Sequence, residues 1–221
     1  MFRSSILGAA TAVAFAIPLP SSAQVSPDSG SYNDLVISGE SGGDQRATTQ
    51  LGSATGAYQF TYGTLRNLGY ISSGPDTVPS GDGEWEGVSW RGLDGVNSRE
   101  DFMNSMHAQD QALSRLTQQN LDAVGHHVGG TANNIPVTEG GAAYTSHMMG
   151  AGAFNNWADC GYQPDCLDPS QAAANNMSVE EYQQHLMERM AEGAGVDPSD
   201  ITQEDGYEGE DLPPAALMPW V

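Results

Sequence analysis

Glu40 is the residue of this sequence best placed for acid–base chemistry. It stands at the end of a short apolar run, and the turn-forming residues Ser41-Gly42-Gly43 follow at once. A polar, glycine-containing loop then leads to Gly56-Ala57-Tyr58-Gln59-Phe60. Glycines let the backbone come close to a ligand, and a carboxylic acid beside such backbone suits cleavage of a glycosidic bond. The two segments therefore predict half of a sugar-cleaving site.

A short helix is expected to present Glu40. Ser31 followed by Asp34 resembles a capping box, and the apolar residues 35–37 begin a buried face. The glycines that come next predict that this helix ends near Ser38-Gly39, so that Glu40 lies at its C-terminus. The helix dipole disfavours negative charge there, which favours the protonated form that a general acid needs.

The second carboxylate of such a site is not evident. Glycoside hydrolysis usually uses two acids. The spacing singles out none of four other candidates: Asp44, Asp94, Asp101 and Glu139. One acid is sufficient if the substrate supplies its own nucleophile, through an N-acetyl group or a nearby hydroxyl. That scheme fits a polymer of N-acetylated sugars.

The apolar periodicity predicts a mainly α fold with long loops and no convincing strand. Helices are expected at Tyr58–Leu68, from Ser98 to Gly125, from Thr138 to Met149, and from a Ser178/Glu181 capping box onward. Residues 71–97 form a long loop with Trp85 and Trp90 embedded in it. These rings could stack on a sugar face or pin the loop to the core, and the sequence leaves both interpretations open.

The chain ends and the cysteines indicate an exported protein. Residues 1–23 have the positive start, apolar run and small-residue cleavage site of a signal peptide, with cleavage near Ala23. We expect one domain over 24–192 and an acidic, largely disordered tail over 193–221.

Cys160 and Cys166 predict a short disulfide rather than a zinc site. The predicted location is periplasmic or secreted.

Charge and histidine placement narrow the partners further. The chain has 7 basic residues, all of them arginine, against 28 acidic ones, for a net charge of −21. Such a surface repels nucleic acid, so no nucleic-acid partner is expected. His126 and His127 are adjacent and cannot share a helical face. We interpret them as loop or cap residues, and we predict no metal and no cofactor.

The ordered motifs resemble those of lytic transglycosylases and the related goose-type lysozymes. In that family a Glu-Ser motif opens the site and a Gly-x-x-Gln motif follows, as Glu40-Ser41 and Gly56 to Gln59 do here. The segment AAYTSHMMGAG, residues 142–152, is similar to a helix of a phage- and secretion-associated branch. The string VSWRGLDGVNSREDF, residues 88–102, also resembles that branch. The resemblance spans residues 32–157 and implies a lysozyme-like domain.

The resemblance also implies a role for each site residue. Glu40 would act as general acid and then as base. Ser41 would steady Glu40 or the substrate, although it could simply form the turn. Gln59 and the backbone of Tyr58 would hold N-acetyl or hydroxyl groups. Tyr144 would lie across the cleft, or it could be a core residue. In the family an asparagine usually follows this tyrosine, whereas here Thr145 does.

The function expected from this resemblance is that of a peptidoglycan lytic transglycosylase. It would cleave the β-1,4 bond between N-acetylmuramic acid and N-acetylglucosamine and leave a 1,6-anhydromuramyl end. The alternatives are a hydrolytic muramidase and a non-catalytic peptidoglycan-binding factor of a secretion system. The expected partners are peptidoglycan glycan strands, with secretion-system components as further candidates. We expect a monomer.

Overall fold

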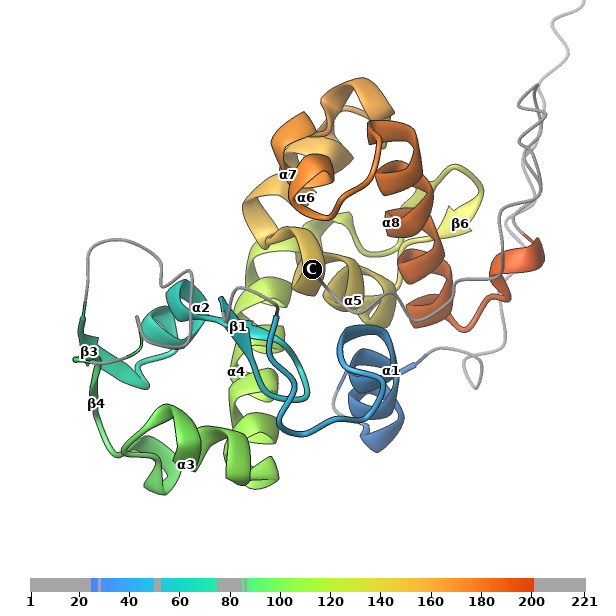
Figure 1. Cartoon of the computed structure of the whole chain (residues 1–221). Helices are drawn as coiled ribbons and strands as arrows, with labels where there is room; N and C mark the ends of the chain where they lie inside the picture. The colour runs from blue at the N-terminus through green and yellow to red at the C-terminus, as the bar shows by residue number, and fades with distance from the viewer. Residues whose placement is uncertain (1–24, 28, 50–52, 75–84, 86, 201–221) are drawn as a thin grey trace, which may run out of the picture.

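A computed structural model describes residues 25–200 except 28, 50–52, 75–84 and 86. The predicted signal peptide and most of the predicted acidic tail lie outside this range. The described chain is mainly α, as the sequence predicts (Figure 1). None of its helices has the length and apolarity needed to span a membrane.

The helices follow one another along the whole described chain. The α-helices are α1 (Gly30–Glu40), α2 (Tyr62–Asn67), α3 (Arg99–Asn104), α4 (Met106–Val124), α5 (Glu139–Met149), α6 (Ala151–Asp159), α7 (Pro169–Ala174) and α8 (Val179–Ala194). Short 3-10 helices are η2 (Leu93–Gly95), η3 (Gly125–His127), η4 (Pro164–Cys166) and η5 (Pro198–Asp200).

Three small antiparallel hairpins, which the sequence did not predict, connect some of these helices. They pair β1 (Ala54–Thr55) with β2 (Phe60–Thr61), β3 (Ile71–Ser73) with β4 (Ser89–Trp90), and β5 (Thr131–Ala132) with β6 (Ile135–Pro136). Each strand has only two or three residues. A segment that short cannot show a period-two pattern in the sequence.

The helix that carries Glu40 differs at both ends from the prediction. Its N-cap is Ser29, whose side chain accepts from the Tyr32 backbone N–H, rather than Ser31. The helix continues through Gly39, and its last residue is Glu40. The backbone N–H of Ser41 then bonds to the carbonyl of Ile37 and closes the last turn. The prediction that Glu40 lies at a helix C-terminus is confirmed.

The segment predicted as one helix from Tyr58 to Leu68 begins instead as a hairpin. Thr55 pairs with Phe60 and Ala54 with Thr61, and α2 starts only after the N-cap Thr61. The predicted helix from Ser98 to Gly125 is likewise divided, because Ser105 has an extended backbone between α3 and α4. Its hydroxyl caps α4 by accepting from Ala108 N–H.

The predicted starts of α5 and α8 are confirmed by their caps. Thr138 accepts from Gly141 N–H, and Ser178 and Glu181 form the complete capping box. Helix α8 ends at Ala194, so its last two residues belong to the stretch assigned to the tail. Helices α6 and α7 were not predicted from the sequence. Between them, the predicted disulfide joins Cys160 and Cys166.

Helices α5 and α8 touch backbone to backbone through glycines. A Cβ on Gly193 would lie 2.5 Å from the Gly140 carbonyl oxygen and 2.7 Å from the Gly141 Cα. Both are closer than side-chain carbons approach in folded proteins, so only glycine fits at Gly193. This contact fixes the position of α8 relative to α5. It therefore also fixes the position of Arg189, which lies one turn before Gly193 on α8.

The buried apolar side chains form two clusters. One gathers around Tyr58, Phe60 and Phe102 and uses residues of α1 to α4. The other gathers around Phe154, Trp157 and Leu186 and uses α6, α7 and α8. Figure 1 shows the same division, with α2, α3 and β3–β4 at one end of α4 and the last three helices at the other. Helix α5 contributes Tyr144 to the first cluster and Met149 to the second.

Trp85 and Trp90 pack against the core, which was one of the two interpretations that the sequence left open. Trp85 is buried and stacks on Trp90 with ring centroids 6.3 Å apart. Its other neighbours are the Tyr62 ring and the guanidinium of Arg99, 4.7 Å from the ring centre. Trp90 in turn packs against Phe102. Both rings therefore serve the first cluster, and neither lines the pocket described next.

Candidate functional site

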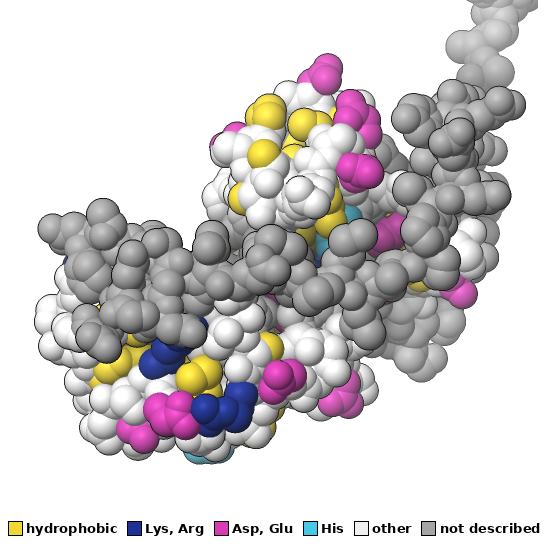
Figure 2. Space-filling model, viewed as in Figure 1, with side chains coloured by type: hydrophobic (Ala, Val, Ile, Leu, Met, Phe, Trp, Pro, Cys, Tyr) yellow, Lys and Arg dark blue, Asp and Glu magenta, His cyan; other side chains and the backbone are white. Residues whose placement is uncertain are grey.

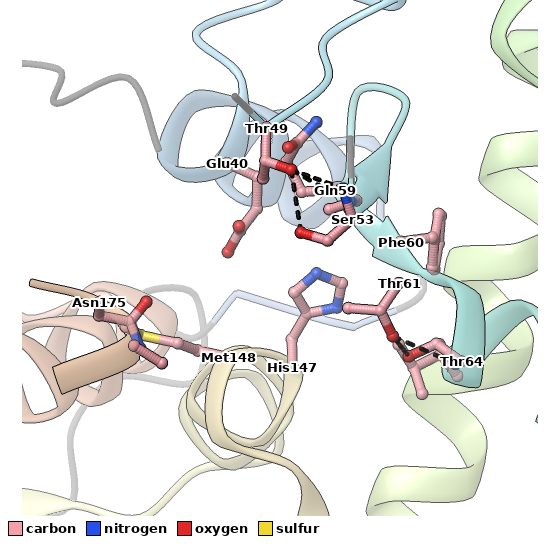
Figure 3. Close-up of a pocket in the computed structure, with 13 residues that line it drawn as sticks. Glu40, Thr49, Ser53, Gln59, Phe60, Thr61, Thr64, His147, Met148 and Asn175 are labelled. Atoms are coloured by element: carbon pink, nitrogen blue, oxygen red, sulfur yellow. Dashed lines mark hydrogen bonds between the residues drawn. The ribbon is translucent and has the colours of Figure 1, made fainter. Parts of the chain in front are cut away.

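A pocket of about 270 Å³ lies where the first half of the chain faces the last helices. One wall comes from the C-terminus of α1, the β1–β2 hairpin and the start of α2. The opposite wall comes from α5 and the end of α7. It is lined by Glu40, Thr49, Ser53, Ala54, Gln59, Phe60, Thr61, Thr64, Leu116, His147, Met148, Ala174 and Asn175. Figure 3 shows Glu40 and Gln59 on one side of this space and His147, Met148 and Asn175 on the other.

Hydroxyl and amide groups provide most of the polar lining. Thr49, Ser53, Thr61 and Thr64 carry hydroxyls, while Gln59 and Asn175 carry amides. Such groups can donate and accept hydrogen bonds without bringing charge. The pocket therefore suits a neutral ligand rich in hydroxyl and amide groups. On the face shown in Figure 2, the acidic side chains lie scattered over the surface rather than gathered in one patch.

Glu40 is buried at the pocket and forms an ion pair with Arg189 of α8. The Nη1 of Arg189 donates to Oε1 of Glu40 at 2.8 Å, and the two side chains are only 2% and 8% exposed respectively. This contact ties the last residue of α1 to α8. Among the described residues, no hydrogen bond reaches Oε2 of Glu40, and that oxygen is the one available to a ligand.

Arg189 is itself held by three neighbours. Its guanidinium lies over the Tyr144 ring, 4.6 Å from the ring centre, and its Nε donates to His185 at 3.2 Å. Burial opposes the charge on Arg189, but Glu40 and Tyr144 outweigh it, and the pKa of Arg189 is raised. The arginine therefore stays charged and fixes the orientation of the Glu40 carboxyl group.

Gln59 closes the turn of the β1–β2 hairpin. Its backbone is left-handed, with φ of 50°, which is uncommon for a residue other than glycine. Its side-chain Nε2 donates to the carbonyls of Gly56 (2.7 Å) and Ala47 (3.1 Å). Both amide hydrogens are thus used to hold the turn, which leaves the amide oxygen of this pocket residue to accept from a ligand.

The Gly-x-x-Gln motif requires glycine at position 56 because of the backbone angle there and the nearby side chain of Gln109. The φ of Gly56 is 84°, and a Cβ there would lie 2.5 Å from the side-chain oxygen of Gln109. That oxygen accepts the Ala57 backbone N–H at 2.6 Å, and Gln109 is fully buried. The Gly-x-x-Gln spacing is therefore the geometry of a tight turn anchored to α4.

His147 lies in the pocket wall and is tied to the hairpin. Its Nε2 donates to the Tyr58 carbonyl oxygen at 3.1 Å. In the neutral ring Nδ1 is then the acceptor, and this buried atom has no partner among the described residues. Burial lowers the pKa of His147. Among the described residues, the structure therefore satisfies only one of the two ring nitrogens of His147.

Three predicted site residues do not line the pocket. Ser41 donates to the Ile37 carbonyl at 3.4 Å and completes the end of α1. Tyr58 is buried, its hydroxyl donates to Asp110, and its carbonyl is occupied by His147. Tyr144 is also buried, and its hydroxyl donates to the Leu35 carbonyl. Tyr144 touches the site indirectly, because Arg189 rests on its ring.

None of the four candidate second acids lines the pocket. Asp94 pairs with Arg115 at 2.6 Å, and Asp101 accepts the Asn97 backbone N–H. Asp44 accepts the backbone N–H of Arg46, and Glu139 is exposed at the start of α5. Within the described part of the chain, Glu40 is the only acidic side chain in the pocket lining.

Sequence reasoning missed Arg189, although a signal for it exists. Arg189 is the only basic residue after Arg115. It lies on the same helical face as Tyr182, Leu186 and Met190, which the apolar spacing already predicts to be buried. A lone arginine on a buried face needs an acidic partner. Glu40, the acid that the motifs predict at the site, could therefore have been inferred as the partner of Arg189.

No protein-family model, curated protein or solved structure matches this chain.

Proposed function

We propose that this protein is a lysozyme-like lytic transglycosylase that cleaves peptidoglycan. The observation that carries the proposal is a pocket lined by hydroxyl and amide groups, with Glu40 as its only acid among the described residues. A pocket with one carboxylate suits a reaction in which the substrate supplies the nucleophile. The proposed substrate is a neutral stretch of N-acetylated sugar polymer, and the proposed activity requires export to the cell wall.

The proposed reaction uses Glu40 twice. The protonated Oε2 donates its proton to the glycosidic oxygen between N-acetylmuramic acid and N-acetylglucosamine, and the bond to the anomeric carbon breaks. The 6-hydroxyl of the muramyl residue then attacks that carbon while the Glu40 carboxylate takes the hydroxyl proton. The products are a 1,6-anhydromuramyl end and a free N-acetylglucosamine end. No water is consumed, and Glu40 finishes protonated.

The other pocket residues bind and orient in this scheme. The free amide oxygen of Gln59 would accept from an N-acetyl N–H or a sugar hydroxyl. Ser53 lies on the same side of the pocket as Glu40 in Figure 3 and Asn175 on the opposite side, and both suit further hydroxyls. Arg189 would hold Oε1 so that Oε2 points to the scissile bond.

A non-catalytic peptidoglycan-binding factor is the second candidate, and the buried ion pair favours it. A carboxylate paired with arginine is often structural, and a structural pair needs no proton transfer. In this case Glu40 would tie α1 to α8, and the pocket would bind glycan without cleaving it. The hydrolytic muramidase is a weaker alternative, because no second acid lines the described pocket to activate water.

The test compares the wild type with Glu40→Gln on purified peptidoglycan. The products are analysed by mass spectrometry, and glycan binding is measured by co-sedimentation. If Glu40 is the general acid, Glu40→Gln should lose about 10²–10⁴-fold in rate while it still binds. Glu139→Gln, at an exposed acid outside the pocket, is the matched control and should keep full activity. Thermal midpoints of all three proteins show whether the loss reflects unfolding.

Each product pattern selects one candidate. Anhydromuramyl ends that depend on Glu40 support the transglycosylase. Reducing muramyl ends that depend on Glu40 would instead support the hydrolytic muramidase. If the wild type binds glycan but is no more active than Glu40→Gln, the result would support the non-catalytic peptidoglycan-binding factor.

A further inference from the structure

Two histidines and an aspartate converge on the surface away from the pocket. His126 and His127 form the end of η3, directly after α4, and Asp159 is the last residue of α6. One ligand atom from each of the three lies within 4.8 Å of the others. His127 Nε2 and Asp159 Oδ1 are 3.8 Å apart. None of the three residues lines the pocket around Glu40.

One buried nitrogen of this cluster has no partner. The Nε2 atom of His127 is buried and has no hydrogen-bond partner among the described residues. A buried polar atom without a partner is unfavourable. The exposed carboxylate of Asp159 lies 3.8 Å from this nitrogen. A cation between the two side chains would bind both of them.

We propose that His126, His127 and Asp159 bind one zinc ion, with water as the fourth ligand. Two imidazole nitrogens and one carboxylate oxygen are ligands that zinc accepts, whereas calcium and magnesium prefer oxygen alone. Tetrahedral ligands at zinc distances are about 3.3 Å apart. The His127–Asp159 separation of 3.8 Å must therefore close by about 0.5 Å. The side chains of His126 and Asp159 are exposed, so they can rotate to bring their ligand atoms closer together.

The adjacency of the two histidines does not prevent shared binding. On an α-helix, neighbouring side chains diverge, but η3 is a single 3-10 turn. Here the two rings lie with centroids 3.9 Å apart. His127 also packs on Phe154 of α6, with ring centroids 5.9 Å apart, which fixes its direction. The ion would fasten the end of α4 to the end of α6, beside the Cys160–Cys166 loop.

The proposal is tested by calorimetric titration of zinc into the full-length protein. One site per chain is expected, with affinity that falls at acidic pH because the ligating histidines must be neutral. His126→Ala and Asp159→Asn should each weaken binding at least about tenfold. Both positions are exposed, so neither variant should unfold the protein. Thermal midpoints should rise on zinc addition in the wild type and much less in the variants.

Matched controls separate this site from the general acidity of the chain. His107→Ala and Asp34→Asn change exposed residues of the same types elsewhere and should bind zinc as the wild type does. Equal zinc binding in all five proteins would overturn the proposal and indicate diffuse attraction to the acidic surface. Absence of binding at about 1 mM zinc, the weak end of the range of measurable affinities, would also overturn it and leave His127 and Asp159 as neighbours that hold no metal.

Discussion

Glu40 and Arg189 lie 149 residues apart in the chain and meet as a buried ion pair. Their attraction has to offset the cost of removing both charges from water, so the pair is weak evidence of stabilisation by itself. Its energetic consequence appears when one partner is removed. The remaining charge is then buried without compensation, and that state is strongly unfavourable.

A double-mutant cycle should reveal this coupling. Glu40→Gln or Arg189→Met alone should each lower the free energy of unfolding by about 3–5 kcal/mol. The double variant removes both charges and should be more stable than either single variant. Urea denaturation of the four proteins gives the four free energies. Simple additivity of the two losses would show that the pair is not coupled as the 2.8 Å contact implies.

His147 predicts a dependence of stability on pH. Its pKa is lowered in the folded protein by burial, whereas in the unfolded chain it is about 6.5. Below about pH 6.5 the unfolded chain therefore binds a proton that the folded protein does not, which favours unfolding. The contribution of His147 is fully present above this pH and is lost as the pH falls toward the folded-state value.

His147→Gln removes the titration but keeps a side-chain N–H that can donate to the Tyr58 carbonyl. The variant should therefore lose less stability than the wild type between about pH 7.5 and about pH 5. Urea denaturation at both pH values measures the difference. His107→Gln, at an exposed position, should behave like the wild type. An equal loss in the wild type and His147→Gln would contradict the assignment.

The site was predictable from sequence only where local spacing defines it. Glu40 and Gln59 belong to short motifs, and both line the pocket. Arg189 and Asn175 reach the site through α8 and α7, whose positions depend on packing between distant segments. Tyr144 and Tyr58 are near the site in the fold, but the neighbouring helices bury them. Whether an aromatic side chain faces a cleft or a core cannot be inferred from its spacing along one helix.

At the scale of elements, the sequence predicted helices better than their interruptions. The caps at Thr138 and Ser178 are local chemistry, and both are present. The breaks at Ser105 and across residues 56–61 were missed. Ser105 stops one helix and caps the next, and the hairpin forms because Gln109, on α4, holds its turn. A contact 52 residues away overrides the local preference for helix.

The backbone contact between α5 and α8 gives a prediction for Gly193. An added Cβ would meet the Gly140 carbonyl, so Gly193→Ala must push the two helices apart. We expect the free energy of unfolding to fall by about 1–3 kcal/mol, the usual cost of overpacking. If Glu40 has the proposed catalytic role, activity on peptidoglycan should fall as well, because Arg189, the partner of Glu40, moves with α8.

Gly152→Ala is the matched control for this substitution. Gly152 is an exposed helical residue of α6, and a Cβ there would meet nothing within 4 Å. Alanine at an open helical position stabilises by up to about 0.5–1 kcal/mol. Chemical denaturation of both variants gives the comparison. A Gly193→Ala protein as stable as Gly152→Ala would show that the two helices separate without cost.

At the scale of the whole molecule, the site lies between two apolar clusters that different parts of the chain build. Helix α5 joins them, and the Glu40–Arg189 pair links the first helix to the last long one. The sequence alone indicated a mainly α domain but not this division, because both clusters draw on helices with similar apolar spacing. The position of the pocket follows from the meeting of the clusters rather than from any single motif.

The C-terminal boundary of the domain is tested by two truncations. Gly193 and Ala194 are buried at the end of α8, and Val196 packs on the second cluster. A chain that stops after Glu192 loses these residues and the left-handed cap at Gly195. Its free energy of unfolding should fall by about 2 kcal/mol from lost burial, or about 4–8 °C in thermal midpoint for a domain of this size.

A chain that stops after Asp200 keeps every contact of α8 and η5 described above, so its thermal midpoint and its activity should match those of the full-length protein. Differential scanning calorimetry and the peptidoglycan assay are run on both truncations. The difference between them isolates the end of α8 from the acidic residues beyond it. The chain that ends at Asp200 could be destabilised as much as the chain that ends at Glu192. In that case the acidic extension contributes to the domain, and the boundary lies beyond residue 200.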